Sequence, residues 1–366
     1  MNFDLTEEQQ LLADTTRDLL AASYDTEKRN KVVESELGWS RDVWQQLAEI
    51  GILGLGFDED SGPTEVMVVL TELGRRLAPE PVASAALIPG AIIAAHGSDD
   101  QRALLDEVAS GELLLAFAHT EPGRRDMAEL ATRATEQGGE WTITGRKNPV
   151  LAGDSADTLI VSAGLPGGGN GLFLVDAAAV TRRGYRTFDG QRGADIDFDG
   201  SSARPLGAGG DASSAIAEAV IRFQSALCAE AVGAMDESLR LTTDYLKTRK
   251  QFGVPLKTFQ TLTQRAADMY VSLELARSMS LYAAVCVADG RFDPVVAARC
   301  KLQIGRSGRH IAQESIQLHG GIGVTAEYPI AHYAARLTAI DQTFGSSSDQ
   351  LRHLSGQVGD YGVVML

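Results

Sequence analysis

The sequence has few cysteines, a deficit of basic side chains and no long apolar run. Its 366 residues include only three cysteines, Cys228, Cys286 and Cys300, which lie far apart and lack the spacing of metal ligands. We therefore expect unpaired, buried thiols in a reducing compartment. The residues before Thr6 lack the basic and apolar regions of a secretory signal, and no run approaches the roughly 18 apolar residues of a membrane helix. These absences predict a cytoplasmic protein without a membrane segment.

Acidic side chains outnumber basic ones by 49 to 33, which gives a formal net charge of −16. Affinity for nucleic acids comes largely from lysine and arginine side chains that neutralise phosphates. The charge balance therefore argues against a nucleic-acid partner. It remains compatible with a phosphorylated small ligand, because a few well-placed arginines can bind such a ligand locally.

Periodicity divides the chain into three segments. Residues 1–113 are predicted to form an N-terminal helical domain, in which Thr6 and Gln9 form a capping box and Ser40 caps a later helix. Residues 114–210 hold almost half of the 38 glycines between short apolar runs, which predicts a middle antiparallel β domain. Residues 211–366 predict a C-terminal four-helix bundle. The predicted fold class is α+β.

The expected elements of the last two segments can be placed approximately. In the middle segment, strands are predicted at Trp141–Thr144, Leu159–Val161, Leu172–Val175 and Ile196–Phe198. In the last segment, apolar residues at helical spacing from Ile216 to Tyr245 predict one helix of about nine turns. A second helix is predicted over 259–288. A third begins with Asp293 as cap and Pro294 at its first position, and stops at Gly320-Gly321.

Several motifs follow one another along the chain. They are Trp44-Gln-Gln-Leu-Ala-Glu-Ile-Gly-Ile-Leu-Gly54, Thr120-Glu-Pro-Gly123, Arg249-Lys-Gln-Phe-Gly253, Phe259-Gln260, Gln317-Leu-His-Gly-Gly-Ile-Gly323 and Glu327-Tyr-Pro329. In this order they resemble the acyl-CoA dehydrogenase family, from about Phe3 to Arg352. The resemblance implies the fold of that family and an FAD-dependent α,β-dehydrogenation of an acyl-CoA thioester.

The resemblance also assigns cofactor contacts. Arg249 matches the family's contact with the FAD pyrophosphate, for which a planar guanidinium fork is better suited than a lysine. The further assigned contacts are Phe252, Gln260, Gln317, Gly320 and Gly321, where the glycines let backbone amides approach the cofactor closely. In this family, these contacts reach the adenosine-diphosphate end of the FAD held by a neighbouring subunit.

The positions that hold the family's catalytic base depart from the pattern. Removal of the weakly acidic α proton requires a positioned carboxylate. The family places this glutamate in a loop after the last long helix, where the present chain has Phe344, or on the long helix, where it has Phe223. The sequence therefore predicts no catalytic residue of its own.

The segments that face the flavin ring depart as well. The loop Thr120-Glu-Pro-Gly-Arg-Arg-Asp126 is one residue shorter than the family's motif and lacks its serine. The family's Trp-Ile-Thr strand, which stacks on and hydrogen-bonds the flavin, is replaced by Pro149-Val-Leu151. The losses lie around the chain's own flavin ring, whereas the matching residues would serve a neighbour's cofactor.

This asymmetry predicts a subunit of a heteromeric, α₂β₂ acyl-CoA dehydrogenase that is inactive alone. A homologous partner would supply the glutamate, bind most of the acyl-CoA and share FAD with this chain, and an electron-transfer flavoprotein would accept the electrons. The resemblance to actinobacterial enzymes of steroid side-chain degradation suggests a steroid substrate. Two alternatives stay open: a homotetramer with a displaced base at Glu230, Asp341 or Asp349, and a flavin-free scaffold of the same fold.

Overall fold

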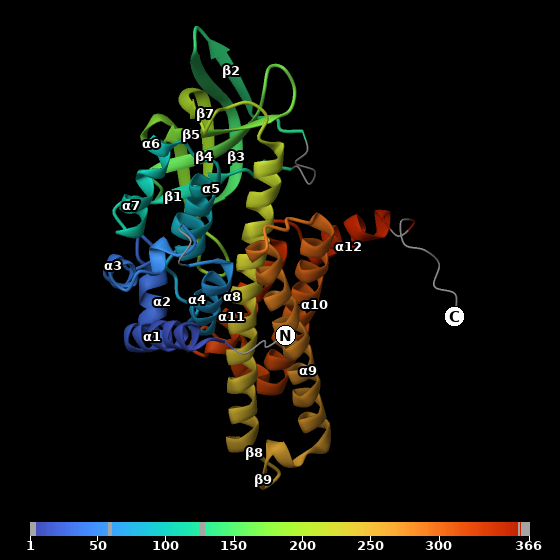
Figure 1. The fold of residues 1–366 in the computed structure, drawn as a ribbon. Coiled ribbons are helices and arrows are strands. Elements are labelled where there is room, and N and C mark those ends of the chain that lie inside the picture. The colour runs from blue at the N-terminus through green and yellow to red at the C-terminus, as the bar shows by residue number, and fades with distance from the viewer. Residues whose placement is uncertain (1–4, 58–60, 124–128, 358, 360–366) are drawn as a thin grey trace. The chain divides into compact units, whose positions relative to one another are not determined.

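The computed structural model describes residues 5–57, 61–123, 129–357 and 359 (Figure 1). The chain divides into two compact units. One comprises the described parts of Met1–Glu27, Met67–Ala78 and Gln224–Leu366, and the other those of Lys28–Val66 and Pro79–Phe223. The predicted division into domains at residues 113 and 210 stays a prediction.

Helices fill the first part of the chain. They are α1 (Glu7–Ser23), α2 (Thr26–Glu34), α3 (Arg41–Glu49), α4 (Pro63–Arg76), α5 (Ile88–His96), α6 (Asp99–Arg102) and α7 (Leu104–Ala109), with short helical turns at Ile52–Gly54 and Ala83–Leu87. The predicted capping box of Thr6 and Gln9 begins α1, and Ser40 caps α3. The sequence pattern does not predict α2, because only Arg29 and Val33 of its nine residues are buried.

A seven-stranded sheet forms the middle of the chain. Its strands are β1 (Leu115–Ala118), β2 (Arg133–Gln137), β3 (Glu140–Leu151), β4 (Thr158–Gly164), β5 (Asn170–Asp176), β6 (Thr181–Arg186) and β7 (Arg192–Pro205). The order is β1-β4-β2-β3-β7-β5, with β6 added beside β7. Because β5 also pairs with β4, strands β4, β2, β3, β7 and β5 form a closed path.

Most strand pairs are antiparallel, as predicted, and each predicted strand lies within β3, β4, β5 or β7. The prediction did not include the parallel pairing of β1 with β4 or the short parallel contact of β2 with β4. Strand β1 is buried at all four positions, so it lacks the alternation of polar and apolar residues that marks a half-buried strand.

The last segment consists of α8 (Ser213–Thr248), α9 (Gln260–Ala288), α10 (Pro294–His319), α11 (Pro329–Gln342) and α12 (Ser347–Gly356). A small hairpin, β8 (Lys250–Gln251) and β9 (Val254–Pro255), joins α8 to α9. Asp293 caps α10 through the Val295 N–H and Pro294 opens it, as predicted. The helix ends at Gly320, whose φ of 66° favours glycine.

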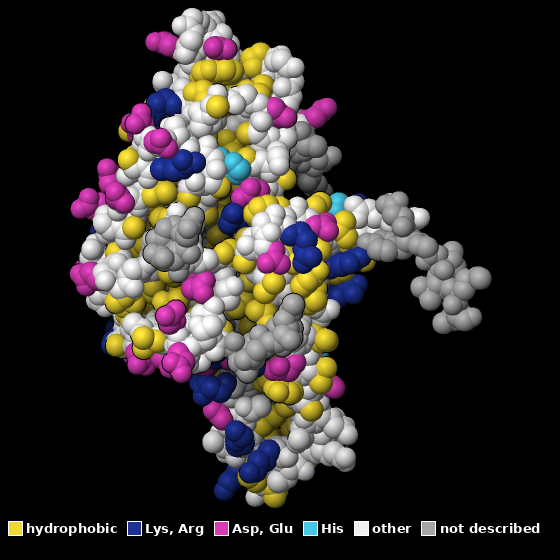
Figure 2. All heavy atoms as spheres, in the orientation of Figure 1, with side chains coloured by type: hydrophobic (Ala, Val, Ile, Leu, Met, Phe, Trp, Pro, Cys, Tyr) yellow, Lys and Arg dark blue, Asp and Glu magenta, His cyan; other side chains and the backbone are white. Residues whose placement is uncertain are grey.

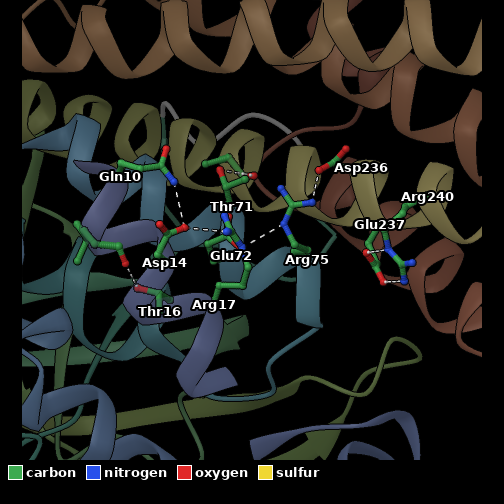
Figure 3. Close-up of polar contacts among 12 residues, drawn as sticks. Gln10, Asp14, Thr16, Arg17, Thr71, Glu72, Arg75, Asp236, Glu237 and Arg240 are labelled. Atoms are coloured by element: carbon green, nitrogen blue, oxygen red, sulfur yellow. Dashed lines mark hydrogen bonds and ion pairs between the residues drawn. The ribbon is translucent and has the colours of Figure 1, made fainter. Parts of the chain in front are cut away.

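Helices α4 and α8 cross at two glycines. A β-carbon on Gly74 would lie 2.0 Å from the Glu230 carbonyl oxygen, and one on Gly233 would lie 1.8 Å from that of Thr71. Polar contacts extend the crossing (Figure 3): Arg17 and Arg75 both bind Glu72, and Arg75 also pairs with Asp236. Close backbone contact and alternating charges therefore hold α1 and α4 to the bundle.

Helix α9 is long and apolar enough to cross a membrane, by length and composition only. Core helices of water-soluble proteins share these properties, and α9 buries Met269, Leu273 and Ala276 among the residues of the bundle core. Its apolar composition is therefore weak evidence for a membrane segment.

Candidate functional site

Three segments meet at the end of the bundle that carries the β8–β9 hairpin. The ring of Tyr245, in the last turn of α8, lies 4.5 Å from the ring of His319 at the end of α10. Near the start of α9, Arg265 forms a bidentate ion pair with Glu314 of α10, with an Nη2–Oε1 distance of 3.0 Å. These contacts bring the end of α8, the start of α9 and the end of α10 together.

The six residues predicted to contact the cofactor all lie on these segments. Arg249 follows α8, Phe252 lies in the hairpin, Gln260 begins α9 and Gln317 belongs to the last turn of α10. Gly320 and Gly321 begin a 3₁₀ turn, Gly320–Val324. All six are exposed. Residues that contact a cofactor held by a neighbouring subunit become buried only when that subunit and its cofactor are bound. The fold brings together residues that are up to 72 positions apart, between Arg249 and Gly321.

The exposed Arg249 side chain forms no ion pair with any residue that the structure describes. Phe252 is 91% exposed, has a φ of 52° and meets the Phe259 ring edge to face, at 6.2 Å between centroids. Exposure and a left-handed backbone are both unfavourable for phenylalanine. In the space-filling view, Lys and Arg side chains gather at this end of the bundle (Figure 2), although the whole chain is acidic.

The turn that contains Gly320 and Gly321 is open on its outer side. A β-carbon added at either glycine would have no neighbour within 4 Å among the described residues. The positive φ by itself explains Gly320, whereas Gly321 has no explanation in packing of the kind that Gly233 has. The guanidinium, two amide side chains and the backbone N–H groups of the glycine turn can donate hydrogen bonds to an anionic dinucleotide, and the exposed aromatic ring can pack against it.

Phe344, the first position of the family's base, lies in the loop between α11 and α12 with a φ of 52°. Its side chain is partly buried and packs against the core of the bundle. Its carbonyl oxygen accepts hydrogen bonds from the amide groups of Gln224, at 2.8 Å, and Gln350, at 3.4 Å. The loop is thus held from both α8 and α12, while its side chain carries no charge.

A buried network anchors the same loop on α10. Lys301 is fully buried and donates to the carbonyl oxygens of Ile340, at 2.6 Å, and Asp341, at 3.1 Å. The Asp341 carboxylate accepts the Ser347 N–H at 3.1 Å. A β-carbon on Gly305 would lie 2.1 Å from this carboxylate. Sequence reasoning missed this network, because none of its residues lies in the motifs that indicated the family.

Phe223, the alternative base position, is buried and belongs to the other compact unit. Its ring stacks on Phe117 of β1, with 5.8 Å between centroids and 14° between planes. No carboxylate can be supplied from this position. Both predicted absences therefore coincide with aromatic rings in apolar surroundings.

Each carboxylate considered as a displaced base has a structural partner. Glu230 forms a bidentate ion pair with Arg336, at 2.6 and 2.7 Å. Asp341 holds Ser347, as described above. Asp349 accepts the Ser346 N–H at 3.1 Å and completes the capping box of α12. Each of the three carboxylates is therefore already engaged in a contact that holds part of the fold.

In the other compact unit, a buried ion pair holds the start of the family's flavin loop. The Lys147 ammonium, fully buried on β3, lies 3.0 Å from the Glu121 carboxylate. Glu121 also accepts the N–H groups of Ala131, at 2.7 Å, and Thr132, at 2.9 Å. Burial alone would raise the pKa of Glu121, but these two amides and the Lys147 charge lower it to about 2.

The sequence contains a signal for this ion pair. Ile143, Gly145 and Lys147 share one face of β3 because side chains alternate along a strand, and Ile143 is completely buried. The alternation therefore places the lysine inside. The predicted differences in the flavin loop at Arg124, Arg125 and Asp126 lie outside the described residues. Pro149 is exposed, Val150 is buried and Leu151 is partly buried at the end of β3.

Comparisons with known proteins agree with these features. Residues 6–112 match the model of the acyl-CoA dehydrogenase N-terminal domain, and residues 218–358 match that of the C-terminal domain. The chain is 29% identical over 362 residues to acyl-CoA dehydrogenase IpdE2 of Mycolicibacterium smegmatis, which covers 97% of this chain and 100% of the relative.

Two solved structures are also similar. A variant of the Tcur3481-Tcur3483 steroid ACAD is 32% identical with a TM-score of 0.90, covering 97% of this chain and 98% of that one. The ChsE4-ChsE5 complex from Mycobacterium tuberculosis is 25% identical with a TM-score of 0.91, covering 99% and 100%.

The chain thus has the fold of a family of flavoprotein oxidoreductases, and it contains a β domain and a helical bundle. The chain belongs to the acyl-CoA dehydrogenase family. The predicted fold class and family are confirmed, whereas the roles of the six cofactor-contact residues stay predictions.

Proposed function

We propose that this chain is the base-free subunit of a heteromeric, FAD-dependent acyl-CoA dehydrogenase. In the assembly, FAD would accept the hydride that leaves the β carbon of the thioester. The partner's carboxylate removes the α proton, and this chain contributes Arg249 and the Gly320-Gly321 turn to the dinucleotide. An electron-transfer flavoprotein-type acceptor would reoxidise the flavin.

The observation that carries the proposal is the contrast between the two kinds of site. The loop at Phe344 is fully anchored and yet carries no base, and the alternative carboxylates have structural partners. The bundle end that carries the β8–β9 hairpin, in contrast, exposes Arg249, which forms no ion pair with a described residue, and the Gly320-Gly321 turn. A chain that retained neither function would be under no constraint to expose such groups.

The surface of α9 supports an assembly. Tyr270, Val271, Leu275 and Tyr282 are between 41% and 57% exposed. Val271, Leu275 and Tyr282 share one face of the helix by their spacing, and exposed large apolar side chains on one face often mark an interaction surface. The relatives support a heteromer and a steroid substrate, because one is a complex of ChsE4 with ChsE5 and another is a steroid ACAD. We propose a steroid side-chain thioester as the substrate class.

The test is to purify the chain alone and together with a homologous acyl-CoA dehydrogenase chain that carries the loop glutamate. We expect little flavin absorbance and no dehydrogenation from the chain alone, and both from the co-purified complex. If the chain formed a self-sufficient homotetramer, the isolated chain would carry a full complement of flavin and would be active. A flavin-free scaffold would give a complex whose flavin content does not depend on this chain.

A further inference from the structure

The turn that would face the dinucleotide rests on a buried histidine. Gly320–Val324 has open space outside Gly320 and Gly321, so its position depends on contacts from within. A β-carbon on Gly323 would lie 3.0 Å from the β-carbon of His319, which shows that the turn folds back over this residue. His319 itself is only 4% exposed.

The His319 ring lies between two tyrosines from different segments. Tyr245, in the last turn of α8, is 4.5 Å away, and Tyr328, just before α11, is 5.1 Å away between ring centroids. The Arg249 N–H donates to the Tyr245 carbonyl oxygen at 2.8 Å. The three rings therefore link the segment of Arg249 to the glycine turn.

Hydrogen bonds determine the tautomer of His319. Nδ1 lies 2.8 Å from the Ser315 carbonyl oxygen, which can only accept, so Nδ1 carries the proton. Burial lowers the pKa of the imidazole, so the ring is neutral and Nε2 is an acceptor. The Tyr328 hydroxyl, 3.2 Å from Nε2, then donates to it. One hydrogen-bonding arrangement therefore fixes both rings.

We propose that His319 and Tyr328 are positioning residues that hold the Gly320-Gly321 turn and Arg249 at the separation required to bind one dinucleotide diphosphate. The inference rests on the proposed function. His319 cannot reach a ligand directly, because it is buried and its two ring nitrogens are occupied by Ser315 and Tyr328. Tilted ring contacts and a neutral hydrogen bond instead keep two binding groups from distant segments in register, which reduces the ordering required on binding.

The experiment uses the co-purified complex, stripped of flavin, and titrates it with FAD. Tyr328→Phe removes one hydroxyl and keeps the ring. His319→Leu removes the ring and both hydrogen bonds. We expect each variant to raise the Kd for FAD by about threefold to tenfold, which corresponds to the loss of a neutral hydrogen bond or ring contact. His310→Leu is the matched control, because His310 lies on the same helix and bonds Ser272 at 2.8 Å, nine positions before His319.

A second readout separates positioning from general stability. ADP competes for the end of the site that this turn would bind, whereas riboflavin carries neither the adenosine nor a phosphate. We expect the affinity for ADP to fall by the same factor as that for FAD, with riboflavin binding unchanged. A lower melting temperature with unchanged FAD and ADP affinities would overturn the inference and leave these residues with a purely structural role.

Arg249→Ala in the same titration separates the inference from the proposed function. If Arg249→Ala weakens FAD binding and the Tyr328→Phe and His319→Leu variants do not, only the positioning role is wrong. If Arg249→Ala also leaves FAD affinity unchanged, the bundle end is not a cofactor site and both proposals fail.

Discussion

The bundle end predicted to contact the cofactor and the strand end predicted to face the flavin ring depart from the family's pattern to different degrees. At the bundle end, the groups that match the family are exposed, and Arg249 forms no ion pair with a described residue. In the sheet, β3 is anchored by the buried Lys147–Glu121 pair, but Pro149-Val-Leu151 stands where the family has Trp-Ile-Thr. A buried pair supports a fold, whereas exposed groups without a role in packing are available to bind a ligand.

Activity of the isolated chain would contradict the prediction that its own flavin site is incomplete. We expect no acyl-CoA-dependent reduction of an electron acceptor by the homogeneous chain, because loss of a general base costs about 10²–10⁴ in rate. Phe344→Glu alone should not create activity, since Pro149 and Leu151 leave the flavin wall incomplete. The co-purified complex is the positive control. Turnover by the isolated chain would favour a displaced base, which Glu230→Gln, Asp341→Asn and Asp349→Asn would then identify.

The buried support of the sheet should be indispensable to folding. Lys147→Met leaves the Glu121 carboxylate buried without its cation, and breaking such a pair costs about 3–5 kcal/mol. Arg146→Met, at the preceding position of β3, is the control: its side chain is half exposed, so solvent screens its ion pairing and we expect a clearly smaller loss of stability. Chemical denaturation followed by circular dichroism measures both. Equal effects of the two substitutions would contradict the importance of the buried pair.

The same pair predicts a dependence on acid. Because the pKa of Glu121 falls from 4.5 to about 2 on folding, its contribution to stability is complete above the higher value and is lost as the pH falls between the two. The free energy of unfolding should therefore decrease over this range in the natural chain. Lys147→Met should make the decrease smaller. An unchanged pH profile would show that other carboxylates dominate.

At the bundle end, Arg249→Ala should weaken FAD retention by the complex roughly 10–100-fold, because a charge-assisted, bidentate contact contributes about 1.5–3 kcal/mol. Arg249→Lys should recover only part of this, since lysine lacks the planar fork. Gln317 and Phe252 substitutions should have smaller effects in the same direction. Arg240→Ala, on the same helix, is the control because its guanidinium pairs with Glu237 and Asp244. The measurement is the amount of bound FAD per complex. An unchanged FAD content in the Arg249→Ala complex would refute the assignment of Arg249 as a cofactor contact.

Gly233 and Gly321 allow packing and predicted ligand binding to be compared within the bundle. Gly233→Ala should destabilise the chain by about 1–3 kcal/mol, because the added methyl meets the Thr71 carbonyl oxygen. Gly321→Ala meets nothing within 4 Å, so the melting temperature should stay unchanged, while the added methyl should lower FAD affinity about twofold to fivefold through loss of close backbone approach. Thermal unfolding and FAD titration of the same samples separate the two. A fall in melting temperature for Gly321→Ala would assign this glycine to the fold.

Local sequence determined much of this protein. The capping box of Thr6 and Gln9, the Asp293-Pro294 start of α10 and the strands around Ile143 and Ile160 follow from patterns a few residues long, because caps and periodic burial depend on near neighbours. The order of motifs identified the family, and the residues Phe223 and Phe344 led to the prediction that the chain lacks a base of its own.

Only the tertiary structure decided which charged side chains are buried and which segments meet. The Lys147 ammonium finds Glu121 at a separation of 26 residues, and Gln224 binds the Phe344 carbonyl oxygen at a separation of 120. Lys301 is buried because the carbonyl oxygens of another helix's end surround its ammonium. Burial of a charged group is favourable only when partners from distant parts of the chain compensate the lost hydration. The packing of the whole chain determines whether those partners lie close enough.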